Sequence, residues 1–253
     1  MKHWKSSLCI FLGGICLPNL ELRAASVSLH PVADTTIQQA YPNNNFGDGT
    51  TLTVGGRRKG GATRALLEFD LSSVPAGSTI NSVTLSLSVT QTPSGGISST
   101  FEVHKLLDSW GEGSGSDHGG SLATAGSATW NVRSSPGTAW TTPGGDIAQT
   151  ISASASIIGT GVYSFSGADL VTDVQNWLND PTSNDGWLLK SGSESTATTI
   201  RRLGGRNDGT FAPTLTINYT PVPEPGTWFL FGFLGSVVLF WGRMGEALNR
   251  SCS

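Results

Sequence analysis

Alternation of apolar and hydroxyl-bearing residues with a period of two constrains the fold of this chain more than any other feature. Apolar side chains stand at every second position from Val83 to Val89, and Ser or Thr fills the positions between them. The segment from Leu215 to Tyr219 repeats the pattern. Because a β-strand places successive side chains on opposite faces of a sheet, each segment is predicted to be an antiparallel strand with one buried and one solvated face.

Further strands are predicted between turn signals rich in Gly, Pro and Asn, at residues 34–37, 51–54, 64–69, 101–107, 147–151, 161–165, 186–190 and 198–203. One segment departs from this pattern, because Leu170, Val174 and Trp177 follow helical spacing within residues 168–178. About ten short antiparallel strands with one short helix predict an all-β fold, a single jelly-roll or β-sandwich domain.

The first 25 residues have the layout of a secretory signal peptide. Lys2 and Lys5 precede an apolar run from Leu8 to Leu17, and small residues around Ala24 suit a cleavage site. The run is shorter than the roughly 20 residues that a membrane-spanning helix needs. We therefore expect export, with residues 1–25 forming a removable signal peptide.

A second apolar segment closes the chain after a Pro-rich linker. The uncharged run carries Trp228 and Trp241 at its two ends, where interfacial anchors of a transmembrane helix stand, and Arg243 follows on the expected cytoplasmic side. The predicted order is a folded domain, a linker with a sorting motif, a transmembrane helix and a cytoplasmic tail, at residues 26–220, 221–226, 227–242 and 243–253.

This C-terminal end resembles the PEP-CTERM sorting signal of Gram-negative bacteria. The resemblance lies in the tripeptide Pro223, Glu224 and Pro225, the apolar span after it and the terminal Arg243. A departure is the basic end, which in most members is a cluster of Arg and Lys. The resemblance implies recognition by the membrane protease exosortase, a transient membrane anchor, and export across the inner membrane to the cell surface or extracellular matrix of a species that secretes polysaccharide.

The order of motifs in the middle of the chain resembles the DNRLRE family, a jelly-roll domain of bacterial and archaeal surface proteins. The likeness covers nearly all of residues 30–220 and lies in segments such as Asp34-Thr35-Thr36-Ile37, Asn43-Asn44-Asn45-Phe46-Gly47, Arg64-Ala65-Leu66-Leu67-Glu68-Phe69-Asp70-Leu71 and Pro213-Thr214-Leu215-Thr216-Ile217. The family usually has an Arg-Glu pair where this chain has Arg206 followed by Asn207. Some relatives are appended to polysaccharide lyases and bind acidic glycans, which implies extracellular polysaccharide as a partner.

Carbohydrate binding through a module-like β domain is therefore the expected function. Sugar-binding sites use aromatic faces against pyranose rings and Arg forks against carboxylates. The candidate residues are Trp110, Trp130 and Trp140 in loop-rich sequence, together with Arg201, Arg202 and Arg206. Arg57-Arg58-Lys59, at a predicted hairpin tip, is a second basic candidate, and solvated turns would explain either cluster as well.

A structural calcium site is a further candidate. Hard oxygen ligands suit Ca²⁺, and carboxylates fall near predicted strand ends at Asp34, Asp48, Asp70 and Asp146. No loop has the spacing of a known calcium motif, so the four positions rest on residue type alone.

Two other functions remain open, although catalysis is not expected. A formal net charge of −3 argues against nucleic-acid binding, and all three cysteines lie in the terminal segments, which excludes thiol chemistry in residues 26–220. A non-binding structural or spacer module is one alternative. A polysaccharide-cleaving enzyme is the other, with Glu68 and Asp70 expected on one strand face, where pairing with Arg64 would explain them equally well.

Overall fold

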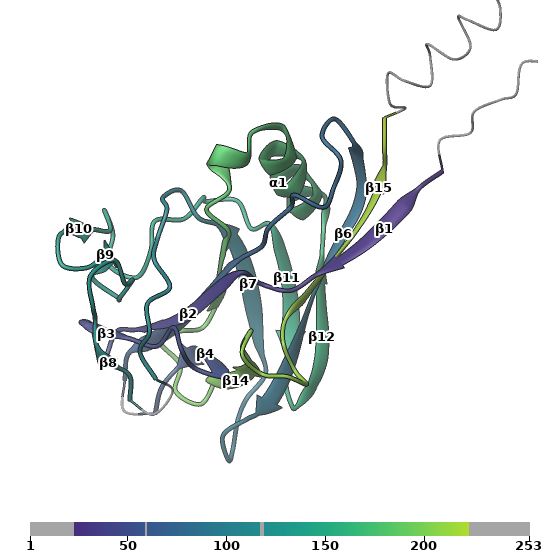
Figure 1. Ribbon diagram of the computed structural model, residues 1–253. Helices are drawn as coiled ribbons and strands as arrows, with labels where there is room; N and C mark the ends of the chain where they lie inside the picture. Colours follow the sequence, from purple (N-terminus) through teal and green to yellow (C-terminus); the bar gives the residue numbers. More distant parts are fainter. Residues whose placement is uncertain (1–22, 59, 117–118, 223–253) are drawn as a thin grey trace, which may run out of the picture.

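The computed structural model describes residues 23–58, 60–116 and 119–222 (Figure 1). The predicted sorting motif Pro223, Glu224 and Pro225, the anchor ends Trp228, Trp241 and Arg243, and nearly all of the signal peptide lie outside these residues. Within the described part of the chain, no helix is long and apolar enough to cross a membrane.

The described residues form one large antiparallel sheet that curls on itself, with one α-helix beside it (Figure 1). The strands run in the order β1-β15-β6-β14-β4-β5-β13-β7-β11, and β12 pairs with β6 while β2 pairs with β5. The bounds are β1 Ala25–Leu29, β2 Ala33–Gln38, β4 Thr51–Gly56, β5 Ala62–Glu68, β6 Thr79–Gln91, β7 Ser99–Lys105, β11 Ala153–Ile157, β12 Gly161–Ser166, β13 Trp187–Ser191, β14 Arg201–Gly204 and β15 Thr214–Thr220. Two short ribbons pair β3 Asn44–Asn45 with β8 Ser121–Leu122 and β9 Val132–Ser134 with β10 Thr138–Ala139.

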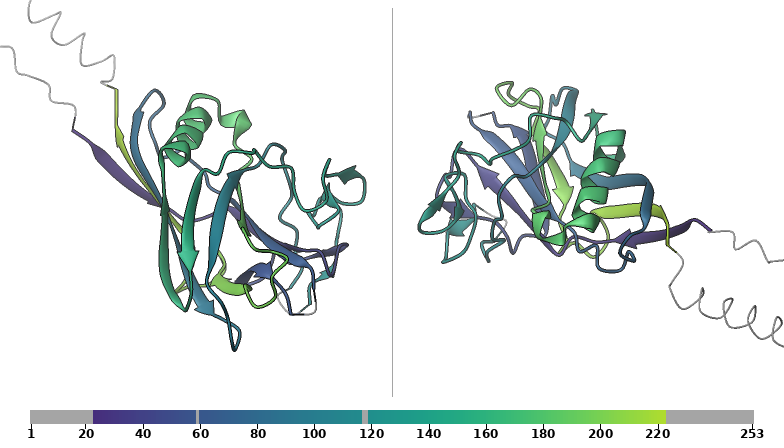
Figure 2. Two further views of the ribbon diagram at one scale, coloured as in Figure 1. Left: turned by 180° about the vertical axis from the view of Figure 1, so that it is seen from behind. Right: turned by 90° about the horizontal axis from the view of Figure 1, so that it is seen from above.

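The sheet folds at β4 into two halves that enclose the main core (Figure 2). Strand β4 pairs with β14 over Thr51–Val54 and with β5 at Gly55 and Gly56, so it belongs to both halves. Inward side chains such as Leu85 of β6 and Trp187 of β13 meet between the halves. The observed architecture is therefore mostly β and consistent with the predicted sandwich or jelly roll.

In the half-sheet of β2, β5, β13 and β7, strands β5 and β13 are buried on both faces. In β5, Ala65 and Leu67 face the main core, while Leu66 between them packs into a second apolar cluster. In β13, Leu188 likewise joins the second cluster. The second cluster is closed from outside by Trp130 and Trp140, which come from the long connection between β7 and β11. Two-faced burial explains why these strands are apolar at consecutive positions rather than alternating.

Helix α1 (Ala168–Asn179) covers one end of the main core. Leu170, Val174 and Trp177 are buried against it, as the helical spacing predicted. The same buried face carries Asp173, whose carboxylate accepts hydrogen bonds from the indole N–H of Trp187 at 2.9 Å and from the hydroxyl of Ser152 at 2.5 Å. These bonds give the buried carboxylate its hydrogen-bond partners. They also join the helix to β13, through Trp187, and to the segment just before β11, through Ser152.

Two expectations from the sequence are wrong in detail. Residues 147–151 form no strand: Ile147 makes a single bridge to Leu106, and the strand that pairs with β7 is β11, whose Ala-Ser alternation is a weak hydrophobic signal. The expected partner of Arg64 is also wrong. Arg64 makes a bidentate ion pair with Glu194 at 2.8 Å, because β13 pairs with β5 and Glu194 lies in the turn that follows β13.

Replacing Trp130 by Ala tests the second cluster. Trp130 is 7% exposed, and the guanidinium carbon of Arg64 lies 5.0 Å from its ring centroid. Removing a buried Trp side chain leaves a cavity that costs about 3–5 kcal/mol of unfolding free energy. Urea unfolding should show that loss, and a variant of unchanged stability would contradict a stabilising role for this cluster.

Candidate functional site

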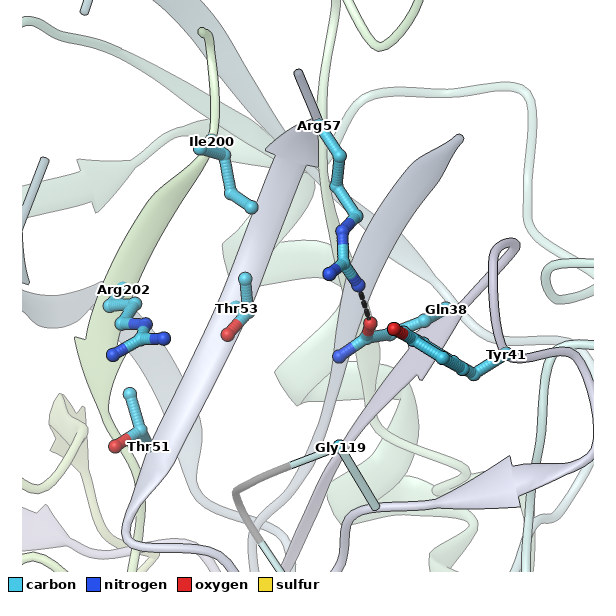
Figure 3. Close-up of a pocket in the computed structure, with 8 residues that line it drawn as sticks. All are labelled: Gln38, Tyr41, Thr51, Thr53, Arg57, Gly119, Ile200 and Arg202. Carbon is cyan, nitrogen blue, oxygen red and sulfur yellow. Dashed lines mark hydrogen bonds between the residues drawn. The ribbon is translucent and has the colours of Figure 1, made fainter. Parts of the chain in front are cut away.

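A groove crosses the outer surface of the sheet where β2, β4 and β14 lie together (Figure 3). We call it the β4–β14 groove. It has a volume of about 280 Å³ and is lined by Gln38, Tyr41, Thr51, Thr53, Arg57, Gly119, Ile200 and Arg202.

Period-two alternation positions the side chains of this groove. Leu52 and Val54 of β4 point into the core, so Thr51 and Thr53 point outward. Arg202 stands opposite Thr53 in the register of the two strands, and Figure 3 shows its side chain beside both threonines. Strand β14 therefore delivers one exposed guanidinium onto a hydroxyl-rich surface.

A second guanidinium comes from the turn that follows β4. Arg57 donates a hydrogen bond to the side-chain oxygen of Gln38, and its guanidinium carbon lies 5.2 Å from the ring centroid of Tyr41. Tyr41 is 43% exposed, so part of its aromatic surface is open to a ligand. An Arg over an aromatic ring is a preorganised cation, because stacking limits the rotamers of both side chains.

The groove is electropositive. Among the described residues that line it are two arginines and no carboxylate. Arg202 is exposed and donates a hydrogen bond to the side chain of Gln91, at 3.1 Å. Planar guanidinium groups of this kind match carboxylates, and hydroxyl and amide groups beside them match sugar hydroxyls.

Arg201, predicted as a binding residue beside Arg202, points the other way. Its side chain is 0% exposed, and burial lowers its pKa from the ordinary value. Its two terminal nitrogens donate to the backbone carbonyls of Ile97, Ile157, Ile158, Thr198 and Ile200. Its Nε has no partner within the described ranges. Arg201 is thus buried away from the groove. Its hydrogen bonds hold together the chain segments around Ile97, Ile157 and Thr198.

Arg206 is also held inside a network. It forms a bidentate ion pair with Glu112, at 2.5 and 2.8 Å, and its backbone N–H donates to Asp34 at 2.6 Å. The hydrogen bonds that Arg206 donates to Glu112, helped by the charges of Glu112, Asp34 and Asp48, raise the pKa of Arg206. The acidic partner of Arg206 thus comes from a separate loop, whereas the residue that follows Arg206 in sequence is Asn207.

The three predicted tryptophans lie outside the β4–β14 groove. Trp130 and Trp140 are 7% and 3% exposed, and the indole N–H of Trp140 donates to Thr129. Trp110 is half-buried and donates to the carbonyl of Asp185 at 2.9 Å. Their role in sugar binding stays a prediction. The aromatic residue in the groove is Tyr41, which sequence reasoning missed because one Tyr in a turn gives no periodic signal.

The four candidate calcium ligands are not brought together. Asp70 lies beyond the end of β5 and accepts from the backbone and hydroxyl of Ser72, while Asp146 accepts from the backbone of two threonines. Asp34 is buried in β2 and Asp48 is exposed. Among the described residues there is no group of three or more His, Cys, Asp or Glu side chains that could hold a metal ion.

A second cavity, of about 620 Å³, opens between the end of β5, the turn after it and the C-terminal end of α1. We call it the acidic cavity. Phe69, Leu71, Val74, Trp177, Leu178 and Pro181 supply most of its apolar wall, and Glu68 and Asp70 both line it. Burial, followed by the charges of Asp185 and Glu112, raises the pKa of Glu68, whereas hydrogen bonds from Ser72 lower the pKa of Asp70.

Residues 25–116 match the family model of carbohydrate-binding module family 96, and no curated protein matches the chain. The matched segment includes the groove residues Gln38, Tyr41, Thr51, Thr53 and Arg57, whereas Arg202 lies beyond it. The chain is thus similar to a carbohydrate-binding module over part of the β domain, in the region that supplies most of the groove.

Alanine substitution of the two adjacent arginines should separate their roles. Arg201→Ala leaves buried carbonyls without donors and is expected to cost about 3 kcal/mol or more of unfolding free energy. Arg202→Ala removes an exposed side chain and should change stability by no more than about 0.5 kcal/mol. Chemical unfolding measures both, and equal losses would contradict the assignment.

Stability should also depend on pH through Glu68. Its pKa in the folded state is raised above the ordinary value, so the folded protein prefers the protonated form and ionisation costs stability. This contribution is fully present below the unfolded pKa and is lost as pH rises through the folded pKa. Glu68→Gln should therefore be more stable than the parent at neutral pH and equally stable near pH 3, as measured by thermal unfolding. A variant that is less stable at neutral pH would contradict this sign.

Proposed function

We propose that this protein holds an acidic extracellular polysaccharide in the β4–β14 groove without cleaving it. The observation that carries the proposal is the pair of arginines, Arg57 and Arg202, in a groove whose described lining has no carboxylate. The similarity of residues 25–116 to a carbohydrate-binding module supports the same class of ligand.

The groove offers a separate contact for each part of a uronic-acid unit. Arg202 is exposed and Arg57 is stacked on Tyr41, so the carboxylates of a polymer find guanidinium donors on two sides of the groove. Thr51 and Thr53 between them present hydroxyls to sugar hydroxyls. The exposed part of Tyr41 offers an apolar surface for the C–H face of a pyranose ring.

The placement of the chain ends supports a surface location. Ala25 pairs with Tyr219, so the two ends of the described chain leave side by side from the extended ribbon of β1 and β15 (Figure 1). Tyr219 pairs with Ile80 near one end of β6, and Arg202 pairs with Gln91 at the other end. At a rise of about 3.3 Å per residue, β6 separates the two positions by about 35 Å. A C-terminal anchor cut or held by exosortase, as the sorting signal implies, would therefore leave the groove pointing away from the membrane.

A binding comparison between polygalacturonate and its fully methyl-esterified form tests the proposal, because esterification removes the carboxylate charge and leaves the sugar rings and their linkages unchanged. The full chain, purified in a non-ionic detergent, should bind the acidic polymer more tightly, and added salt should weaken binding. Arg202→Ala and Arg57→Ala should each lower the affinity by about tenfold, the worth of one charge-assisted hydrogen bond. Isothermal titration calorimetry measures both effects.

Arg58→Ala is the matched control for this experiment. Arg58 is exposed, neighbours Arg57 and does not line the groove, so its loss removes the same charge without removing a contact. If Arg57→Ala and Arg58→Ala lower the affinity equally, the effect comes from the general charge of the protein. That result would contradict binding in the β4–β14 groove. Absence of binding by a chain that unfolds cooperatively would favour the alternative of a structural spacer.

A further inference from the structure

The acidic cavity has the composition of a ligand site and lies on other elements than the β4–β14 groove. Its volume of about 620 Å³ falls within the range of about 300–1,000 Å³ that small-molecule sites occupy. Its lining combines the apolar residues Leu71, Val74 and Leu178 with the acidic residues Glu68 and Asp70. Among the described residues that line it there is no Lys or Arg.

Glu68 is the group in this cavity that lacks a partner. Asp70 is satisfied by the backbone and hydroxyl of Ser72, at 2.8 Å each. The carboxylate of Glu68 is half-buried and has no hydrogen bond or ion pair within the described part of the chain. Its charged neighbours, Asp185 and Glu112, are acidic and raise its pKa further.

The cations that act on Asp185 and Glu112, the acidic neighbours of Glu68, are already engaged. Arg206 is committed to Glu112 by two hydrogen bonds, and Arg133 lies 3.8 Å from Asp108. Neither side chain lines the cavity. The field at Glu68 therefore favours a positive charge that must come from outside the described chain, and a half-buried carboxylate gains most from a partner that also displaces its water.

We propose that the acidic cavity binds a protonated amino sugar, with the ammonium group on Glu68 and the C–H face of the ring against the apolar wall. A pyranose ring is compact and partly apolar, which suits the wall of Leu71, Val74 and Leu178. A divalent metal ion is a poorer occupant, because the described residues hold no group of three or more acidic or metal-ligating side chains. The domain would then carry two sites of opposite charge, one for an acidic polymer and one for an amine-bearing saccharide.

Titration with three sugars that differ at one substituent tests the inference. Glucosamine, glucose and N-acetylglucosamine are added to the full chain at constant pH and ionic strength, and the fluorescence of Trp177 on the cavity wall reports binding. Glucosamine should bind saturably and at least tenfold more tightly than either neutral sugar. Equal binding of all three sugars, or no saturable signal from glucosamine, would overturn the proposal.

Glu68→Gln identifies the site without the risk of unfolding, because that variant is expected to be at least as stable as the parent at neutral pH. It should weaken glucosamine binding by about tenfold, whereas Asp169→Asn should leave binding unchanged. Asp169 is an exposed carboxylate in the first turn of α1 and does not line the cavity, so it controls for net charge. Equal effects of the two variants would refute a specific role for Glu68.

Two further arms distinguish the acidic cavity from the β4–β14 groove and from a general amine site. Arg202→Ala should not change glucosamine binding, and Glu68→Gln should not change polygalacturonate binding. The proposal for one site can therefore be refuted without affecting the proposal for the other. Lysine methylamide supplies an amine without a sugar ring. If it binds as tightly as glucosamine, the cavity selects amines in general, and the assignment to an amino sugar is wrong.

Discussion

Burial of β5 and β13 on both faces is the constraint on which the rest of this structure depends. Leu66 and Leu188 point away from the main core, and the chain must cover them with a second apolar layer. The long connection between β7 and β11 supplies that layer through Trp130 and Trp140. These two tryptophans therefore pack in the second cluster instead of standing exposed on a loop, where they could contact a sugar.

The covering connection is held by polar bonds at its base. Asn45 is buried, and its side-chain amide donates to the carbonyls of Glu112 and Ala128 while its oxygen accepts from Gly47 and Gly115. Position 115 needs a glycine, because a Cβ there would lie 1.9 Å from the carbonyl oxygen of Asn45. The pair of Arg206 and Glu112 ties the same connection to the turn after β14. Thus the strand that carries the groove arginine and the loop that closes the second core are fixed to each other.

Charge is distributed unevenly over the domain. Two guanidinium groups meet a hydroxyl-rich surface in the β4–β14 groove, while Glu68 and its acidic neighbours face an apolar cavity near α1. A formal net charge of −3 does not reveal this separation, because it sums the charges of the whole chain without regard to their positions. Composition excluded general binding to nucleic acid, but only the spatial separation of charges indicates two distinct ligand chemistries.

Local patterns in the sequence predicted most of the strands and the helix, since the periods of two and 3.6 residues are set by backbone geometry alone. They also placed Arg202 and Arg57 among the basic candidates, but they predicted Arg201 as a binding residue too, and the structure buries it. The burial of Arg201, the partner of Arg206 and the exposure of each Trp depend on tertiary contacts between separate segments, such as Arg206 with Glu112 and Arg201 with Ile97. Such contacts arise when the sheet curls and its loops close over it, so tertiary structure alone brought Tyr41, Arg57 and Arg202 to one groove.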